Sequence, residues 1–315
     1  MPTPKFAIFS GSSHKELAKA VAKELKHDLG KVKLTEFSSG EKYVMLEESV
    51  RGQEVFIIQT CRDVWVNEDL MELFLMINAA KLSFASKIHV IIPHFGYARQ
   101  DKVHSPREPI SAKLVGDLLV TAGADHVITF ELHADQTQAF FDVPVDNIKL
   151  YKLFADYIKK KKLKDITIVS PDEGGAKNAK KLADLVGAPI AILHKSRPAH
   201  NEAVTTHVVG DVKGRTCVIF DDMVDTAGSV VAAGRALKEN GANKDIYLAA
   251  THPIFSGPAK ERLDKAGFKE VMVTDTLPVE KEKKFKGLRQ ISIAPLLAEI
   301  IGSVTHQKSV SKLFY

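Results

Sequence analysis

The chain has 315 residues, which is long for one domain and suits two domains of about 150 residues each. A hydrophobic content of 45% and a charged content of 26% are ordinary for a soluble globular protein. The net charge of +5 is mild, and the dense basic block at 159–162 is expected to be the solvated end of a helix. These values do not favour a nucleic acid partner, which usually requires a clustered basic face.

Cysteine usage and hydropathy indicate a cytoplasmic protein. Two cysteines, Cys61 and Cys217, are too few for a disulfide framework and are expected to be buried free thiols in a reducing compartment. The first residues lack the charged-then-apolar pattern of a signal peptide. No apolar run approaches the roughly 20 residues that a membrane helix needs. We therefore expect a cytoplasmic location and no membrane partner.

Short apolar runs alternate with helical patterns along almost the whole chain. The runs predict strands at 6–9, 55–59, 88–92, 127–131, 166–169, 190–193, 216–220, 246–249 and 271–273. Helices are predicted at 15–28, 69–81, 110–121, 150–160, 176–186, 229–239 and 258–266. Strands alternating with helices predict an α/β fold of mostly parallel sheets that helices cover on both faces.

The two halves of the chain share a faint pattern. Residues 122–125 and 240–243 each precede a strand that ends near a histidine, His133 and His252 respectively. The first predicted strand of each half leads into a small-residue loop and a Lys/Ala-rich helix. A duplicated domain explains both similarities, but the succession of helices, turns and strands that is common in α/β proteins also explains them.

The segment after the strand at 216–220 is the most informative part of the chain. In open α/β sheets ligands bind outside the carboxyl ends of the strands, so the loops that follow strands are the candidate sites. Asp221 and Asp222 follow an apolar run and can bind sugar hydroxyls or a hydrated metal. The small residues at 225–229 then open a helix, where backbone N–H groups and hydroxyls suit a phosphate. Acids next to a phosphate cradle predict a phosphorylated ribose as the ligand.

Two loops of the first half carry aromatic or imidazole groups. The segment 93–102 places aromatic residues beside glycine and Arg99, which suits a stacked purine with its phosphate on the arginine; otherwise it is an exposed loop. His133 follows the strand at 127–131 and is a metal ligand, a substrate contact or a structural histidine. The sequence alone leaves these alternatives open.

Two loops of the second half carry charges. Asp172 and Glu173 precede paired glycines, which indicates either metal binding near a phosphate or a helix N-cap. Lys195 and Arg197 follow the strand at 190–193 and are either surface charges or part of a site. No Cys/His cluster has zinc spacing and no P-loop motif is present, so any phosphate chemistry is not of the P-loop kind.

Taken together, these segments resemble the phosphate-activated class of ribose-phosphate diphosphokinase, also called 5-phosphoribosyl 1-pyrophosphate (PRPP) synthetase. The resemblance covers nearly the whole chain and rests on segments at 37–41, 48–52, 67–73, 95–101, 107–113, 133–136, 141–147, 221–229 and 309–314. It implies two phosphoribosyltransferase-like domains related by duplication, at 1–147 and 148–315, with the last segment packing back on the N-terminal domain. It also implies a homo-oligomer, a hexamer assembled from dimers.

The resemblance implies a reaction and assigns its parts to residues. The β,γ-diphosphoryl group of ATP passes to the 1-hydroxyl of ribose 5-phosphate, giving PRPP and AMP for nucleotide biosynthesis, with Mg²⁺ as cofactor. The residues matching the ATP site are Phe37, Ser39, Gly40, Glu41, Arg99, Gln100 and Asp101. Those matching the ribose 5-phosphate site are Asp221 and Asp222 for the hydroxyls, with Asp225, Thr226, Ala227, Gly228 and Ser229 for the phosphate. The remaining matches are the metal ligands His133 and Asp172, the catalytic cations Lys195 and Arg197, and a regulatory site for inorganic phosphate and ADP at Ser49, Arg51, Ser309 and Ser311.

Three departures from the family pattern are expected to have consequences. Ser39 stands where the family usually has Asp or Asn, which puts an adenine contact in doubt. Leu82 and Phe84 stand where members often carry an Arg and a Ser that help to bind the regulatory phosphate or ADP. We therefore expect altered phosphate activation or weaker ADP inhibition. His104 and Pro106 are the third departure and change the composition of the loop that precedes Arg107.

Two other functions fit parts of the sequence. A phosphoribosyltransferase shares the loop at 221–229 but needs neither the segment 95–101 nor two domains. A non-catalytic regulatory paralogue would bind the same ligands, but such proteins carry insertions or damaged catalytic loops, whereas the corresponding loops are intact here. Ribose-phosphate diphosphokinase activity is therefore the prediction.

Overall fold

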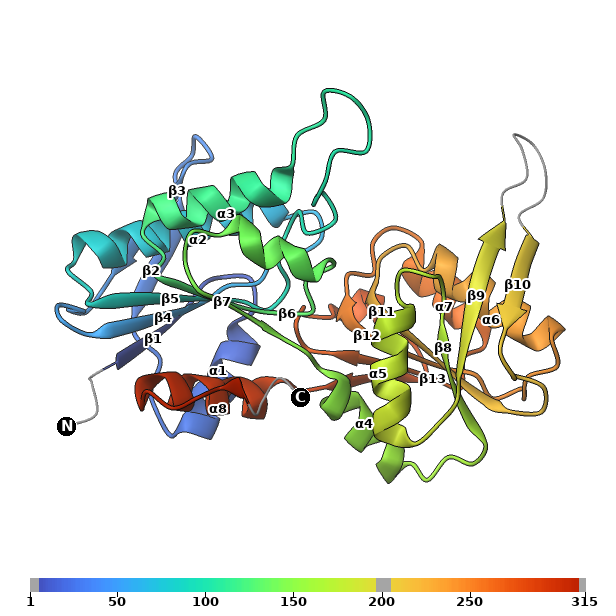
Figure 1. Cartoon of the computed structure of the whole chain (residues 1–315). Coiled ribbons are helices and arrows are strands. Elements are labelled where there is room, and N and C mark those ends of the chain that lie inside the picture. The colour runs from blue at the N-terminus through green and yellow to red at the C-terminus, as the bar shows by residue number, and fades with distance from the viewer. Residues whose placement is uncertain (1–5, 197–204, 312–315) are drawn as a thin grey trace. The chain divides into compact units, whose positions relative to one another are not determined.

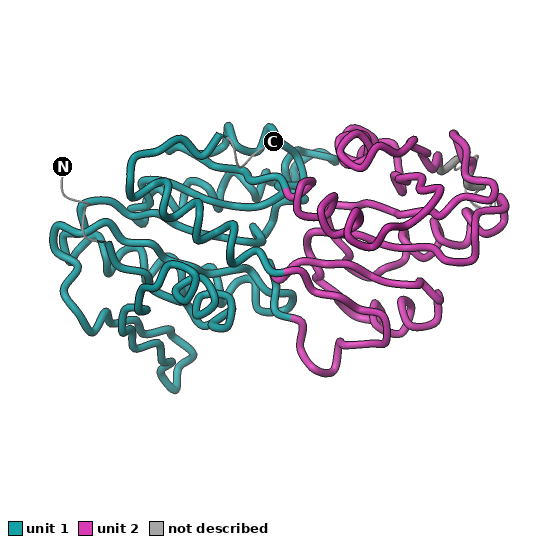
Figure 2. The backbone as a smooth tube through the Cα atoms, turned by 90° about the horizontal axis from the view of Figure 1, so that it is seen from below, with its two compact units in different colours: residues 1–149, 276–278, 292–315 teal, residues 150–275, 279–291 magenta. Residues whose placement is uncertain are grey.

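The computed structural model describes residues 6–196 and 205–311, except for the side chains of 195, 196, 205 and 206. The chain folds into two compact units (Figure 2). Unit 1 comprises residues 1–149, 276–278 and 292–315, and unit 2 comprises residues 150–275 and 279–291. The C-terminal segment therefore belongs to the same unit as the N-terminal segment.

Unit 1 is built on a five-stranded parallel sheet (Figure 1). Its strands lie in the order β1 (Phe6–Ser10), β4 (Glu54–Ile58), β5 (Lys87–Ile92), β6 (His126–Phe130) and β7 (Val145–Ile148). One face is covered by α2 (Val66–Leu82) and α3 (Ser111–Ala122), and the other by α1 (Lys15–Leu25) and α8 (Ala294–Thr305). An antiparallel hairpin joins β2 (Val32–Glu36) to β3 (Lys42–Leu46), and β3 packs against α2.

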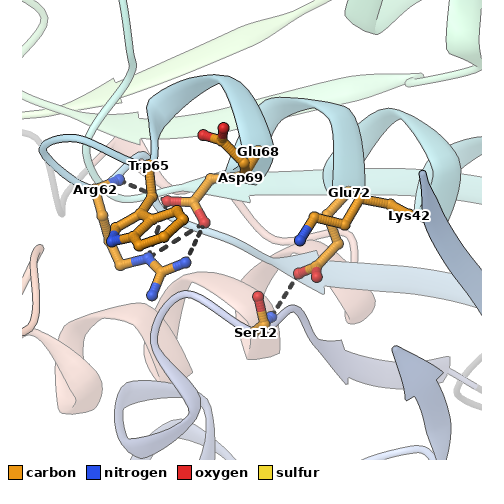
Figure 3. A pocket seen from close by; sticks show the side chains of 7 residues that line it. All are labelled: Ser12, Lys42, Arg62, Trp65, Glu68, Asp69 and Glu72. Atoms are coloured by element: carbon orange, nitrogen blue, oxygen red, sulfur yellow. Dashed lines mark hydrogen bonds and ion pairs between the residues drawn. The ribbon is translucent and has the colours of Figure 1, made fainter. Parts of the chain in front are cut away.

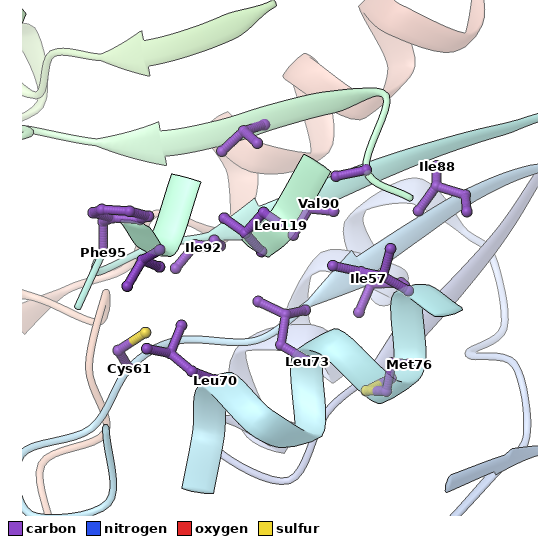
Figure 4. Close-up of a cluster of buried hydrophobic side chains, with 14 of the residues drawn as sticks. Ile57, Cys61, Leu70, Leu73, Met76, Ile88, Val90, Ile92, Phe95 and Leu119 are labelled. Carbon is purple, nitrogen blue, oxygen red and sulfur yellow. The ribbon is translucent and has the colours of Figure 1, made fainter. Parts of the chain in front are cut away.

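One buried cluster of unit 1 lies between the sheet and the helices on its α2 face (Figure 4). Ile57, Val90 and Ile92 from β4 and β5 belong to the same buried cluster as Leu73 and Met76 of α2. These side chains are fully buried, and truncating a buried leucine to alanine costs about 2–5 kcal/mol in typical cores. The central strands read as continuous apolar runs because helices cover both faces. This packing fixes α2 and thereby the loop that connects β4 to it.

Unit 2 contains a seven-stranded sheet whose described strands are all parallel except the edge strand β10. The order is β10 (Thr205–Val209), β9 (Ile190–Ser196), β8 (Ile166–Ser170), β11 (Thr216–Val224), β12 (Tyr247–Pro253), β13 (Glu270–Thr274) and β14 (Leu288–Ile291). The helices are α4 (Tyr151–Lys160), α5 (Ala176–Val186), α6 (Gly228–Glu239) and α7 (Ala259–Ala266). A second buried cluster joins strands β11 to β13 with α6 and α7, and this positions the loops at the carboxyl ends of those strands.

The two sheets repeat one strand order. The series β1-β4-β5-β6-β7 of unit 1 matches the series β8-β11-β12-β13-β14 of unit 2. Helix α4 follows β7 in the chain and packs on α5, whereas α8 follows β14 and packs on α1. In each unit, the first helix after the first strand of the sheet therefore packs against the helix that follows the last strand of the other sheet. The usual alternation of helices, turns and strands in α/β proteins does not require the two sheets to share a strand order. Duplication of one domain therefore explains the similar patterns in the sequence better.

The α/β fold class is confirmed, and all nine predicted strands and seven predicted helices are present. The helix predicted at 15–28 was too long, because Lys26 takes a left-handed conformation (φ 51°) and its N–H bonds back to Ala22. The sequence reading missed α8 and five strands, namely β2, β3, β7, β10 and β14. Each missed strand has only four or five residues and includes polar ones, so its periodicity is weak.

Two further expectations concern cysteines and membranes. Cys61 and Cys217 are both buried and free, as predicted. Burial raises the pKa of the Cys61 thiol to about 12, so this group stays protonated at neutral pH. None of the helices in the described ranges is long and apolar enough to cross a bilayer.

Candidate active site

Two carboxylates lie inside strand β11, which extends four residues beyond the predicted strand. The predicted strand ended at Phe220, but β11 continues to Val224 and carries Asp221 and Asp222. The neighbouring strand makes this extension possible, because β12 pairs with β11 in parallel register as far as Val224. Both carboxylates therefore have a fixed backbone, and both are partly exposed near the carboxyl end of the sheet.

A cluster of negative charge surrounds Asp221. Burial raises the pKa of Asp221 well above its usual range, and the carboxylates of Asp222 and Asp172 raise it further. The Asp222 N–H donates to Asp221 Oδ1 at 2.9 Å. Asp172 comes from the loop between β8 and α5, and β8 lies next to β11. The cluster favours a ligand that brings hydrogen-bond donors or positive charge, although no three His, Cys, Asp or Glu side chains of the described residues are placed to hold a metal ion alone.

Helix α6 begins after an alanine, whose side chain cannot cap the helix. Ala227 precedes the helix and has a left-handed φ of 62°, which is uncommon for a residue other than glycine. Ala227 carries only a methyl group and makes no side-chain capping hydrogen bond. The neighbouring Thr226, Gly228 and Ser229 are exposed. A helix N-terminus with small exposed residues is suited to bind a phosphate.

In the loop between β8 and α5, Asp172 is held by hydrogen bonds within the loop. Its Oδ1 accepts a hydrogen bond from the Gly175 N–H at 2.9 Å, while Ser170 Oγ donates to its main-chain oxygen at 2.6 Å. The N-cap of α5 is Gly175, so Asp172 does not cap the helix as the sequence alternative proposed, and its side chain is exposed. Lys195 belongs to β9, and Arg197 lies outside the described residues.

In unit 1, the predicted adenine-binding residues lie at the tip of the β2–β3 hairpin. Phe37 is 56% exposed and meets Tyr43 edge to face, with ring centroids 5.6 Å apart. Ser39 Oγ donates to Glu41 Oε2 at 2.7 Å, and Gly40 takes a φ of 89° that glycine adopts without steric cost. An exposed ring beside a hydroxyl and a carboxylate suits stacking and hydrogen bonding of a base.

The other predicted ATP and metal residues of unit 1 lie in loops after β5 and β6. Arg99 and Gln100 are exposed between β5 and α3, where Ser111 Oγ donates to Gln100 Oε1 at 2.5 Å. Asp101 follows them and is partly buried. His133 is exposed in the loop after β6. These loops both start at the carboxyl edge of the sheet, where ligands of α/β proteins bind.

The predicted regulatory residues are also in unit 1. Ser49 and Arg51 are exposed, and the Arg51 guanidinium stacks on the Phe84 ring with Cζ 4.2 Å from the centroid. Ser309 Oγ donates to Ser311 Oγ at 3.0 Å. One of the two unusual apolar residues noted in the sequence therefore contacts an arginine of the predicted regulatory set.

Comparison with known proteins identifies the family. Residues 6–123 match a model described as the N-terminal domain of ribose phosphate pyrophosphokinase, and residues 195–315 match a phosphoribosyl synthetase-associated domain. The ribose-phosphate pyrophosphokinase of Bacillus subtilis is 48% identical over 307 residues, covering 98% of this chain and 96% of that protein. The protein of the same name from Corynebacterium ammoniagenes is 47% identical with the same coverage. The chain belongs to the ribose-phosphate pyrophosphokinase family.

A solved structure agrees with this ribose-phosphate pyrophosphokinase assignment. The phosphoribosylpyrophosphate synthetase from Mycobacterium smegmatis has a TM-score of 0.91 and 46% identity, covering 96% of this chain and 99% of that chain. The family recognised from the sequence segments, and the α/β fold that it implied, are therefore confirmed.

This member of the ribose-phosphate pyrophosphokinase family also has a cavity in unit 1 that the sequence did not predict (Figure 3). The cavity has a volume of about 250 Å³ and is lined by Ser12, Lys42, Arg62, Trp65, Glu68, Asp69 and Glu72. It lies at the carboxyl ends of β1 and β4, whose counterparts β8 and β11 carry the carboxylate cluster of unit 2. No local motif indicated it, because its residues come from three separate segments.

The chemistry of this cavity differs from that of its counterpart in unit 2. Glu68 and Asp69 lie in the first turn of α2, where negative charge opposes an anionic ligand. Arg62 is bound to Asp69 at 2.7 Å, and Glu72 Oε1 accepts the Ser12 N–H at 2.7 Å. Unit 1 has thus kept the duplicated fold without a phosphate-binding loop at this position.

Proposed function

We propose that this chain transfers the β,γ-diphosphoryl group of ATP to the 1-hydroxyl of ribose 5-phosphate, giving PRPP and AMP for nucleotide biosynthesis. The observation that carries this proposal lies in unit 2, where converging carboxylates adjoin the start of helix α6. The carboxylates suit the ribose hydroxyls, and the helix start suits the 5-phosphate. The relatives named ribose-phosphate pyrophosphokinase support the reaction.

The sugar is held by β11 and the loop that follows it. Asp221 and Asp222 accept hydrogen bonds from the ribose hydroxyls, and residues 225–229 surround the 5-phosphate. Because its pKa is raised, Asp221 is also suited to take a proton from the attacking 1-hydroxyl. The strand fixes these groups before the substrate arrives, which lowers the cost of orienting it.

Diphosphoryl transfer needs in-line geometry and charge neutralisation more than covalent help. Lys195 and Arg197 stabilise the charge that moves toward the departing AMP. The residues that bind ATP are Phe37, Ser39, Gly40, Glu41, Arg99, Gln100 and Asp101. Their exposure on a hairpin tip and on a loop after β5 supports this assignment.

Mg²⁺ fits the donors that the chain offers. His133 and Asp172 are both exposed on loops that follow strands. Mg²⁺ usually keeps several waters and takes substrate phosphate oxygens as ligands, so few protein ligands suffice. When bound, the ion neutralises charge on the ATP phosphates. An oxygen ligand suits this hard ion better than an imidazole, so Asp172 is the stronger of the two ligands.

Regulation, assembly and location complete the proposal. Inorganic phosphate and ADP act at a site formed by Ser49, Arg51, Ser309 and Ser311. The chain forms a homohexamer assembled from dimers, and the protein is located in the cytoplasm. The Phe84 ring stacks on one face of the Arg51 guanidinium and restrains the orientation of its in-plane N–H donors. This supports an altered response to phosphate and ADP.

The test is AMP release from ATP and Mg²⁺ with and without ribose 5-phosphate, at several concentrations of inorganic phosphate and ADP. The proposal predicts AMP release that depends on ribose 5-phosphate, with one PRPP formed for each AMP. PRPP consumption with a purine or pyrimidine base would instead indicate a phosphoribosyltransferase. Ligand binding without any turnover would indicate a regulatory paralogue.

A further inference from the structure

The segment between β12 and α7 braces the loop proposed to hold the 5-phosphate. The Phe255 N–H donates to Val224 O at 3.0 Å, and the Ser256 N–H donates to Asp225 O at 3.2 Å. Ser256 Oγ also donates to the Asp225 carboxylate. The loop thus receives support from a part of the chain about 30 residues further on, which the parallel pairing of β11 and β12 brings beside it.

Arg262 reaches the same loop from the first half of α7. Its Nη1 donates to the main-chain oxygen of Thr226 at 3.0 Å. The same nitrogen lies 3.5 Å from the point that a Cβ would occupy on Gly228, the first residue of α6. Its neighbour on the helix, Leu263, is buried, and this anchors the backbone from which Arg262 extends. The guanidinium therefore lies directly against the proposed phosphate cradle.

The segment that forms the proposed phosphate cradle contains no positively charged side chain. The segment 216–234 contains three carboxylates, those of Asp221, Asp222 and Asp225, and has no Lys or Arg. A phosphate dianion next to three carboxylates needs a nearby cation beyond the partial charge of a helix end. Among the described residues, Arg262 forms no ion pair, and the bond to Thr226 uses only one of its five N–H donors.

We propose that Arg262 determines the specificity for a phosphorylated ribose, by binding the 5-phosphate while it holds the loop through Thr226. This inference rests on the proposed function and adds a residue to its ribose 5-phosphate site. Arg262 supplies the cation that the loop lacks, and its planar fork offers several donors to phosphate oxygens. Arg262 therefore distinguishes ribose 5-phosphate from ribose, whereas β11 binds the hydroxyl groups that both sugars share.

The experiment compares the affinities of the full chain and its variants for ribose 5-phosphate and for ribose, by calorimetry and saturation-transfer NMR without ATP. Arg262→Met should raise the Kd for ribose 5-phosphate roughly 10- to 100-fold, as expected for losing a charge-assisted contact, and change that for ribose less than about twofold. Arg262→Lys keeps the charge without the fork and should fall between. The matched control is Lys260→Met, which removes one positive charge from an exposed position of the same helix and should leave both affinities unchanged.

Three outcomes would overturn the inference. An equal loss of affinity for both sugars in Arg262→Met would show that the side chain only supports the loop. Unchanged affinity for ribose 5-phosphate would show that it does not reach the phosphate. If Arg262→Met fails to fold, Arg262→Gln takes its place, because glutamine can still donate to the Thr226 oxygen but carries no charge, and wild-type affinity of that variant for ribose 5-phosphate would show that no cation is needed here. Failure of the wild-type chain to bind ribose 5-phosphate would instead refute the proposed function itself.

Discussion

Replacing Asp221 with asparagine should stabilise the ligand-free protein and impair its activity. Asp221 is largely desolvated and lies beside the carboxylates of Asp222 and Asp172, which together raise its pKa. Each unit of pKa elevation corresponds to about 1.4 kcal/mol of unfavourable interaction with the ionised form. Asparagine keeps an oxygen that can accept the Asp222 N–H and removes the charge. We therefore expect Asp221→Asn to have a higher unfolding free energy than the wild type at pH 7.

The gain should depend on pH in a defined direction. The folded pKa of Asp221 lies above its unfolded value, so the folded state binds the proton more tightly than the unfolded state. The ionised side chain therefore costs stability at pH values above the folded pKa. This cost disappears as the pH falls through the folded pKa toward the unfolded value near ~3.9. The stability of the wild type should accordingly approach that of the variant on acidification.

The assay is chemical denaturation without ligand or Mg²⁺ at several pH values, together with AMP release dependent on ribose 5-phosphate. Asp264→Asn removes a charge from an exposed position of α7 and serves as the matched control. Activity of Asp221→Asn should fall roughly 10- to 100-fold, since a charge-assisted hydrogen bond is replaced by a neutral one. If the variant is no more stable than the wild type at pH 7, or if the gap widens on acidification, the electrostatic reasoning is wrong.

Three other substitutions test separate parts of the account. Lys149→Met should destabilise the protein by about 3–5 kcal/mol in thermal unfolding, because it removes the cation that lies 3.2 Å from the buried carboxylate of Glu131, near His133. A change in stability below about 1 kcal/mol would contradict this prediction. Phe84→Ser should lower the half-activating phosphate concentration about two- to fivefold, because it releases Arg51 from the cation–π contact that restrains the orientation of its N–H donors. An unchanged half-activating concentration would show that this aromatic ring does not affect regulation. Lys195→Ala should lower kcat roughly 100-fold or more with KM within about threefold, whereas a loss confined to KM would make it a binding residue.

The sequence predicted those parts of the fold and site that are contiguous in the chain. The apolar runs of the central strands were recognised because both faces of those strands are buried. Asp221, Asp222 and the loop at 225–229 could be proposed as a site from the sequence because a strand, a loop and a helix start carry the whole motif in one segment, and their role in binding stays a prediction. The fact that β11 continues through both carboxylates was missed, since it depends on pairing with β12 and not on local hydrophobicity.

The parts that the sequence did not predict depend on tertiary placement. Arg262 and Ser256 touch the phosphate loop only because β12 lies beside β11, and nothing in their own segment marks them as ligand-binding. One signal was available, because both follow the strand next in sequence at the same sheet edge. The cavity around Arg62 was missed for the same reason, since α2, the β1–α1 loop and β3 contribute its lining. Short mixed strands such as β14 lack a pattern that distinguishes them from loops.

The most direct test of the central claim is a ³¹P NMR time course of the purified protein with ATP, Mg²⁺ and ribose 5-phosphate. The account predicts that AMP and a ribose carrying an anomeric diphosphate appear at equal rates, and that neither forms when ribose 5-phosphate is left out. The spectrum also distinguishes the position of bond cleavage. Formation of ADP would show transfer of the γ-phosphoryl group alone, and formation of AMP with free pyrophosphate would show hydrolysis; either result would contradict diphosphoryl transfer to the sugar.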